Sequence, residues 1–251
     1  MSSRDNSPMN LQRIAAPLLL LTLAACGHKP PAAPAAPPPP KPIVKKIGFL
    51  PVHELTNVSF ENKNFALTVL FPIAGAGISS SNKSKQQIFS TQFLALKPTL
   101  GKQLMDDVSR ELEREGYQVV VLEDVPRPPK DPEKIDLDKI KADADAILHV
   151  YFDEIGLYST NLSPDYLPRI NIRAALQSTK IDDELYGEKL CWGIDAQAGE
   201  GWAIPADKKI AYNTFDIVMA QLPDIANQFE GASQALAKRM VARMKVELNT
   251  P

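Results

Sequence analysis

A proline-rich run near the N-terminus divides this chain of 251 residues. Eight of the fourteen residues from position 29 to position 42 are proline, and most of the others are alanine. Proline fixes φ and lacks an amide hydrogen, so such a run cannot form a helix or join the centre of a sheet. We expect a polyproline II tether that rises about 3.1 Å per residue and so reaches roughly 40 Å. A passive spacer is one interpretation, and a PxxP ligand for an aromatic groove is the other.

A short apolar segment precedes this tether. Arg13 is followed by residues 14–23, which only Pro17 and Thr22 interrupt. The segment is too short to cross a bilayer, which needs about 20 apolar residues, and it is typical of the core of a signal peptide. Met9 would make a complete start for such a peptide, so it is an alternative initiator to the first methionine.

The apolar segment ends in the four residues Leu23, Ala24, Ala25 and Cys26. This ending resembles the lipobox of bacterial lipoproteins. The resemblance implies that the lipoprotein signal peptidase recognises the three residues before the cysteine and removes residues 1–25. Cys26 would then carry a diacylglycerol thioether and an acylated amine, and several acyl chains give a lasting membrane anchor. The alternative is an ordinary secretory signal that leaves Cys26 as a free thiol.

The residue after Cys26 bears on the compartment. Gly27 stands where an aspartate would favour retention in the inner membrane, so resemblance to enterobacterial sorting implies the outer membrane. We therefore expect a signal peptide over residues 1–25, a lipidated cysteine and tether over residues 26–44, and a periplasmic domain over residues 45–251.

The domain after the tether is long enough to bury a core without a disulfide or a structural metal. Once Cys26 serves as the anchor, Cys191 is the one cysteine left, so no internal disulfide can form. A formal net charge of −2 does not favour nucleic acid as a partner.

Hydrophobic periodicity predicts a βαβ unit at the start of the domain. Residues 47–52 are predicted to form a strand that lies at a sheet edge or ends at Pro51. Residues 97–115 are predicted to form a helix with Pro98 in its first turn and Gly116 as its stop. Residues 117–123 (YQVVVLE) follow as a strand with too few polar residues for an exposed position. The apolar face of the helix repeats every four residues, at Leu100, Leu104, Val108 and Leu112.

The second half of the domain is predicted as a three-strand antiparallel meander followed by helices. The strands are residues 145–158, 169–180 and 184–192. Thr214 is expected to cap a first helix, and Pro223 to begin a second that Gly231 breaks or bends. The fold class is therefore α/β (α+β): a single domain of two or three layers, with a mixed sheet, a βαβ start, a meander and packing helices.

This order of elements, placed after a lipobox and a tether, resembles the TolB N-terminal-like α/β domain. Envelope lipoproteins of the CsgG type, which form secretion channels, and of the LpoB type, which activate peptidoglycan synthases, use this domain. The likeness is carried by residues 47–52, 98–116, 117–123 and, above all, 142–148 (ADADAIL). The resemblance implies the fold and the envelope compartment, and it offers these two roles as alternatives. Channel-forming relatives devote long amphipathic hairpins to the membrane, and Pro72 and Gly75 fit badly in a lipid-facing strand.

Residues 65–78 (FALTVLFPIAGAGI) are the most apolar stretch after the tether, and the polar residues 79–87 after them are expected to be flexible. One interpretation is a buried strand or irregular segment that covers the core. The other is an exposed loop that contacts the membrane or a partner subunit. Trp202, in a loop predicted for residues 193–209, is a second contact candidate, unless it folds back onto the core. The candidate contact residues are Phe65, Leu67, Val69, Phe71, Ile73 and Trp202.

No motif in the chain supports an enzyme, a metal or a cofactor. His53 and Glu54 begin an HExxH pattern whose second histidine is absent. His149, Tyr151 and Asp153 share one face of a predicted strand, which would suit an acid/base set in an envelope hydrolase. The alternative is a wet sheet face with a histidine satisfied by hydrogen bonds. Cys191 is expected to be a buried, inert thiol rather than a nucleophile.

The sequence therefore predicts a non-catalytic lipoprotein of the outer membrane that faces the periplasm. Its expected partners are the membrane, through Cys26, and an envelope protein that it contacts during envelope biogenesis or secretion. Homo-oligomers are a further option, and nucleic acid is not an expected partner.

Overall fold

The computed structural model describes residues 42–62, 72–128, 130–159, 165–205, 207 and 209–249, with the backbone alone for residues 72–82. Pro40–Pro251 form one compact unit with its own hydrophobic core. The predicted signal peptide, Cys26 and the tether up to residue 41 lie outside the described residues. So do Phe65, Leu67, Val69 and Phe71.

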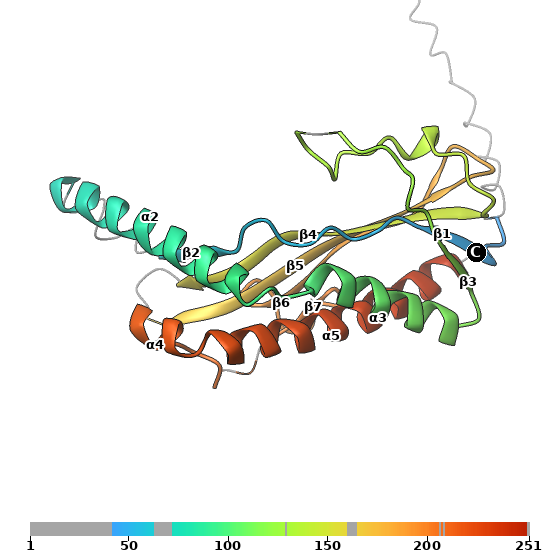
Figure 1. Ribbon diagram of the computed structural model, residues 1–251. Helices are drawn as coiled ribbons and strands as arrows, with labels where there is room; N and C mark the ends of the chain where they lie inside the picture. The colour runs from blue at the N-terminus through green and yellow to red at the C-terminus, as the bar shows by residue number, and fades with distance from the viewer. Residues whose placement is uncertain are drawn as a thin grey trace, which may run out of the picture. The chain divides into compact units, whose positions relative to one another are not determined.

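The described chain builds one mixed sheet of seven strands (Figure 1). Its order is β3-β1-β4-β5-β6-β7, and β2 pairs with β4 off this path. This sheet and its helices confirm the predicted α/β class. The strands are β1 (Lys46–Phe49), β2 (Ser59–Asn62), β3 (Gln118–Val121), β4 (Ala146–Ser159), β5 (Tyr166–Ser178), β6 (Glu184–Gly193) and β7 (Ala203–Ile204).

The predicted βαβ start is confirmed, with two corrections. Strand β1 pairs in parallel with β3 on one side and with β4 on the other, so it lies inside the sheet rather than at an edge. It ends at Phe49, shortly before Pro51, which agrees with the other alternative. Strand β3 is the edge strand instead, and Val121 is 37% exposed. Its apolar residues predicted burial, but β3 ends the sheet and pairs with β1, so its outer edge stays open and Gln118 and Val121 are exposed.

The meander β4-β5-β6 is confirmed, and its two faces differ in character. One face of the meander is buried in the hydrophobic core, and its residues come from alternate positions along the strands. They include Leu148, Val150, Ile170, Ile172 and Leu176. A bulge at Asp153 shifts the register between Phe152 and Glu154. Strands β1 and β2 pair with opposite ends of the long β4, β1 at residues 146–148 and β2 at residues 156–159. These two pairings define the two ends of the domain.

Two long helices, α3 (Leu100–Arg114) and α5 (Leu222–Asn249), cover one face of the sheet side by side (Figure 1). The predicted apolar face of α3 is buried as expected. Lys97 adopts a φ of 53°, so the chain turns there and the helix begins at Leu100, after Pro98. Thr214 starts α4 (Phe215–Ala220), where its hydroxyl accepts a hydrogen bond of 3.2 Å from the Ile217 amide. Helix α5 continues through Gly231 without a break.

The prediction for residues 65–87 was wrong from Pro72 onwards, because this part belongs to a helix. Helix α2 (Pro72–Ala95) includes the segment expected as a strand or loop and the polar segment expected to be flexible. Proline fits the first turn of a helix, since its missing amide hydrogen has no partner there. Phe89 and Phe93, one turn apart, are fully buried, and this spacing is the helical signal in the sequence.

Candidate functional site

The sheet face opposite α3 and α5 is polar, and residues 122–145 between β3 and β4 fold over part of it (Figure 1). These residues are called the β3–β4 segment here. It contains one short 3-10 helix, η1 (Leu137–Lys139), and is longer than most connections in a compact domain.

Glu133 ties the β3–β4 segment to the sheet. Its carboxylate lies 2.8 Å from His149 Nε2 on β4, 3.1 Å from His53 Nδ1 after β1, and 3.2 Å from Arg127 Nη1. Burial alone would raise the pKa of Glu133, but the hydrogen bond from His149 and the charges of His149, Arg127 and His53 outweigh it and lower the pKa. A carboxylate is acceptor-only, so the His149 imidazole presents its Nε2–H to it.

Arg127 extends this attachment to the backbone. Besides pairing with Glu133, it donates hydrogen bonds to the carbonyl oxygens of Pro51 and, at 3.3 Å, of Pro132. Glu133 and Arg127 therefore attach the segment to β4 and to the end of β1.

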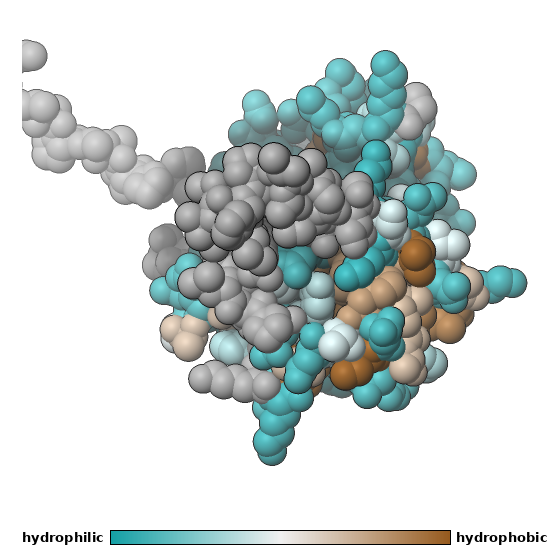
Figure 2. All heavy atoms as spheres, turned by 90° about the vertical axis from the view of Figure 1, so that its left-hand side faces the viewer, coloured by the Kyte–Doolittle hydropathy of each residue, from teal (hydrophilic) through white to brown (hydrophobic). Residues whose placement is uncertain are grey.

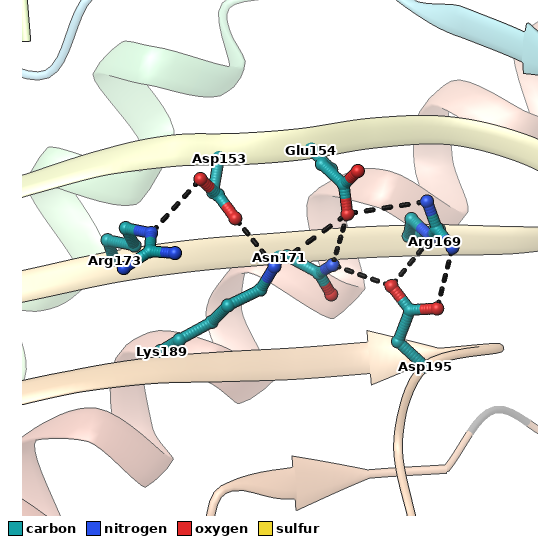
Figure 3. Close-up of polar contacts among 7 residues, drawn as sticks. All are labelled: Asp153, Glu154, Arg169, Asn171, Arg173, Lys189 and Asp195. Carbon is teal, nitrogen blue, oxygen red and sulfur yellow. Dashed lines mark hydrogen bonds and ion pairs between the residues drawn. The ribbon is translucent and has the colours of Figure 1, made fainter. Parts of the chain in front are cut away.

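A second polar group lies farther along β4, on strands β4, β5 and β6 and the loop after β6 (Figure 3). Asp153 lies 2.6 Å from Lys189 Nζ and 3.1 Å from Arg173 Nε. Burial would raise the pKa of Asp153, but these two cations lower it overall.

Arg169 and Asn171 make the buried half of this group (Figure 3). Arg169 pairs with Asp195 at 2.6 Å and with Glu154 at 3.3 Å, and its guanidinium lies 3.7 Å from the ring centroid of Tyr158. Asn171 Nδ2 donates to Asp195 at 2.7 Å and to Glu154 at 3.0 Å. Each carboxylate shown is therefore paired with a neighbouring cation, and Glu154 and Asp195 also accept a hydrogen bond from the Asn171 amide.

The predicted row of His149, Tyr151 and Asp153 does not converge on one point. His149 is buried beside Tyr151, at 5.0 Å between ring centroids, and pairs with Glu133. Asp153 sits at the bulge and pairs with Arg173 and Lys189 instead. For His149 the alternative prediction, a histidine satisfied by hydrogen bonds, is confirmed.

His53 is the accessible member of the Glu133 cluster, with 40% of its side chain exposed. It lines a polar groove of about 370 Å³ together with Ser59, Glu133, Asp153 and Tyr158. The Glu133–His53 pair resembles the carboxylate and imidazole of a catalytic triad, in which the carboxylate orients the imidazole. Among the described residues, however, no hydrogen bond joins His53 to a hydroxyl or thiol that could act as the nucleophile.

The remaining candidates are placed as follows. Cys191 is buried on β6, and burial raises the pKa of its thiol, as expected for an inert cysteine. Trp202 is half-buried, and its carbonyl accepts a hydrogen bond of 3.1 Å from the Cys191 amide, so its backbone lies along β6. Ile73 lies in the first turn of α2, where only the backbone is described.

Asp145 gives the sequence motif of residues 142–148 a physical role. Its carboxylate accepts hydrogen bonds of 2.9 Å from the amides of Lys45 and Lys46 and lies 2.5 Å from Lys180 Nζ. The Lys180 contact first, and then the two amides, lower the pKa of Asp145 far below its usual range. Asp145 thereby fixes the start of β1, where the described chain enters the sheet.

Within the described ranges, no group of histidine, cysteine, aspartate and glutamate could hold a metal ion. In the same ranges, no helix combines the length and the apolar character needed to cross a membrane.

No protein-family model matches the chain, and no curated protein matches it. Among solved structures, a Xanthomonas campestris protein of family model DUF330 is 14% identical, with a TM-score of 0.34 over 59% of this chain and 62% of that one. The chain therefore spans less than two thirds of that protein. The lipoprotein GNA1162 from Neisseria meningitidis is 15% identical, with a TM-score of 0.27 over 73% and 99% of the two chains.

A third similar structure is the hypothetical protein CT253 from Chlamydia trachomatis, 14% identical, with a TM-score of 0.28 over 77% and 99% of the chains. At these identities and TM-scores the similarities carry no argument about family or function. The resemblance to TolB-type lipoprotein domains therefore stays a prediction from the sequence.

Proposed function

We propose that the chain is a lipoprotein of the outer membrane whose domain acts in the periplasm as a non-catalytic interaction or assembly factor. The process it serves is envelope biogenesis or secretion. The observation that carries the proposal is the separation of two ends of the domain. The chain enters at β1, held by Asp145, whereas β2, α2 and α4 lie toward the other end (Figure 1). An anchored domain would present this far end to a partner.

The far end carries exposed apolar side chains over a rigid aromatic base. Phe60 of β2 stacks on Tyr166 at 4.4 Å between centroids and meets Phe215 of α4 edge-on at 5.0 Å. Ile88 of α2 is 46% exposed and Ile217 of α4 is 41% exposed. Figure 2 faces this end of the molecule and shows apolar surface on it. Exposed apolar surface at one end of a domain is typical of protein contacts.

The polar face of the sheet supports a non-catalytic role. His149 and Asp153, the candidates for acid/base chemistry, are engaged by Glu133 and by Arg173 and Lys189. Their contacts are those expected of residues that hold loops and strands in place. In a hydrolase that used both, replacing the two by alanine would abolish function and leave stability unchanged. We instead expect a loss of stability, measurable by urea unfolding.

In-cell photo-crosslinking tests the contact surface. A crosslinker at Ile217 or Ile88 should capture the same envelope protein from each position, in cells that carry the anchored full chain. Ile181 is the matched control, since it is 44% exposed but lies in the turn after β5, at the end where the tether joins. Equal capture from Ile181, or no capture from either far-end position, would contradict the proposal.

The two alternative roles predict different results. A channel-forming secretion lipoprotein should appear as a ring by electron microscopy in detergent, and a monomer at micromolar concentration counts against it. An activator of the LpoB type should capture a peptidoglycan synthase from Ile217 or Ile88.

A further inference from the structure

The β3–β4 segment lines a pocket that shares only Arg127 with the contacts described above. Residues 124–128 and 134–136, together with residues 139–141, face each other around a volume of about 610 Å³. This volume is within the range of about 300–1,000 Å³ that is usual for small-molecule sites. The pocket lies outside the polar groove of His53, which shares none of its lining residues.

The walls of the pocket are apolar and held in place. They are formed by Val125, Pro126, Pro128, Ile135 and Ile140. The two prolines restrict the backbone, and the Arg127–Glu133 pair joins the two arms of the segment. Because Glu133 is also bonded to His149 on the sheet, the pocket is preorganised, which reduces the entropy lost when a ligand binds.

The rim of the pocket carries an excess of positive charge. Lys139 is neutralised by Asp136, at 2.6 Å. Lys134 and Lys141 are exposed, and neither forms an ion pair with a residue that the structure describes. Of the two carboxylates in the lining, Asp136 pairs with Lys139, and Asp124 has no cation partner among the described residues. Two unpaired ammonium groups beside apolar walls suit a ligand with an anionic end and an apolar body.

We propose that this pocket binds a small amphiphilic anion, an apolar chain that ends in a carboxylate or phosphate. The chain packs against the valine, proline and isoleucine walls, and the anion is held by Lys134 and Lys141. A neutral chain lacks the charge-assisted hydrogen bonds, and a free anion lacks the apolar contact.

Calorimetric titration of residues 40–251, the compact unit with its own core, tests the pocket directly. Decyl phosphate below its micelle concentration should bind with one-to-one saturation. Decyl maltoside and inorganic phosphate should each bind at least about tenfold more weakly, because each supplies one of the two interactions. Equal binding of the neutral decyl compound would overturn the proposal.

Two lysine variants locate the site. The double variant Lys134→Ala/Lys141→Ala should weaken decyl phosphate binding about tenfold or more, since both ammonium groups are lost. Lys130→Ala is the matched control, because Lys130 is an exposed lysine of the same segment that does not line the pocket. Equal losses in both variants, or no loss in the double variant, would show that binding is not in this pocket.

Vesicles distinguish the source of the anion. If the ligand is a membrane phospholipid, phosphatidylglycerol vesicles should bind the unaltered protein and Lys130→Ala but not the double variant. If it is a soluble amphiphile, decyl phosphate should bind and the vesicles should not. Vesicle binding that is equal in all variants, without saturable binding of decyl phosphate, would refute a pocket of either kind.

Discussion

At the scale of single residues, the polar face of the domain depends on Glu133. This residue lies in a proline-rich loop without periodicity, and it brings together His53, Arg127 and His149 from separate parts of the chain. In the sequence, His149 is visible as a candidate acid/base residue and His53 only as part of an incomplete HExxH pattern. Their shared partner Glu133 cannot be recognised in the sequence, because it lies 16 residues from His149 and 80 residues from His53 along the chain.

Replacing Glu133 by glutamine should destabilise the domain by about 1–3 kcal/mol at neutral pH, because three cationic or donor groups lose a carboxylate partner. Urea unfolding measures the change. Glu123→Gln is the control, since Glu123 is an exposed carboxylate of the same segment, and its loss should change stability by less than about 0.5 kcal/mol.

The effect of Glu133→Gln should also depend on pH. The folded state lowers the pKa of Glu133, so its stabilising contribution is present above the unfolded value of about 4.3 and is lost as pH falls through the lower folded value. The difference between the variant and the unaltered protein should therefore shrink below about pH 4. A difference that grows on acidification would contradict this assignment.

At the scale of elements, α3 depends on a close contact with the chain after β1. Glu54 accepts hydrogen bonds from the amides of Gly101 and Lys102, at 3.0 and 2.8 Å, and so satisfies the N-terminus of the helix. The incomplete HExxH pattern thus contains a helix-capping carboxylate. Gly101 allows the approach, since a Cβ there would lie 2.5 Å from the His53 carbonyl oxygen.

Two helical glycines should therefore respond in opposite directions to alanine. Gly101→Ala should lower stability by about 1–3 kcal/mol, because the His53 backbone must move. Gly231→Ala in α5 has no atom within 4 Å of the new Cβ and should raise stability by about 0.5–1 kcal/mol through helix propensity. Thermal unfolding of both variants measures the shifts; a stabilised Gly101→Ala protein would refute the close contact.

At the scale of the whole molecule, the proposed function joins a membrane anchor to a domain with a distinct far end. Cys26→Ala should abolish metabolic palmitate labelling, because the thioether and the acylated amine both require Cys26. Persistent labelling would refute the lipoprotein assignment.

The tether should act through its length. Deleting residues 31–40 should shorten the reach by about 30 Å and remove the crosslink from Ile217, while palmitate labelling continues. A tether of the same composition in shuffled order is the control, and it should keep the crosslink. Loss of the crosslink in the shuffled tether would favour a PxxP ligand over a spacer.

The sequence by itself determined the features that depend on neighbouring residues. Proline content predicts the tether, which lies outside the described residues, and four-residue spacing identified the buried face of α3, with Gly116 after its end. Alternation located the strands of the meander. These patterns are local because helix and strand periodicity act within a few residues.

Only the tertiary structure decided the features that depend on distant contacts. Helix α2 looked like a strand or loop, since its helical signal is the burial of Phe89 and Phe93 against the rest of the core. The pocket of Lys134 and Lys141 exists because Glu133 and Arg127 join two arms of a loop that has no repeating pattern. Asp145 was recognisable as part of a motif. Its hydrogen bonds to the amides of Lys45 and Lys46 at the start of β1, about 100 residues earlier, became visible only in the folded chain.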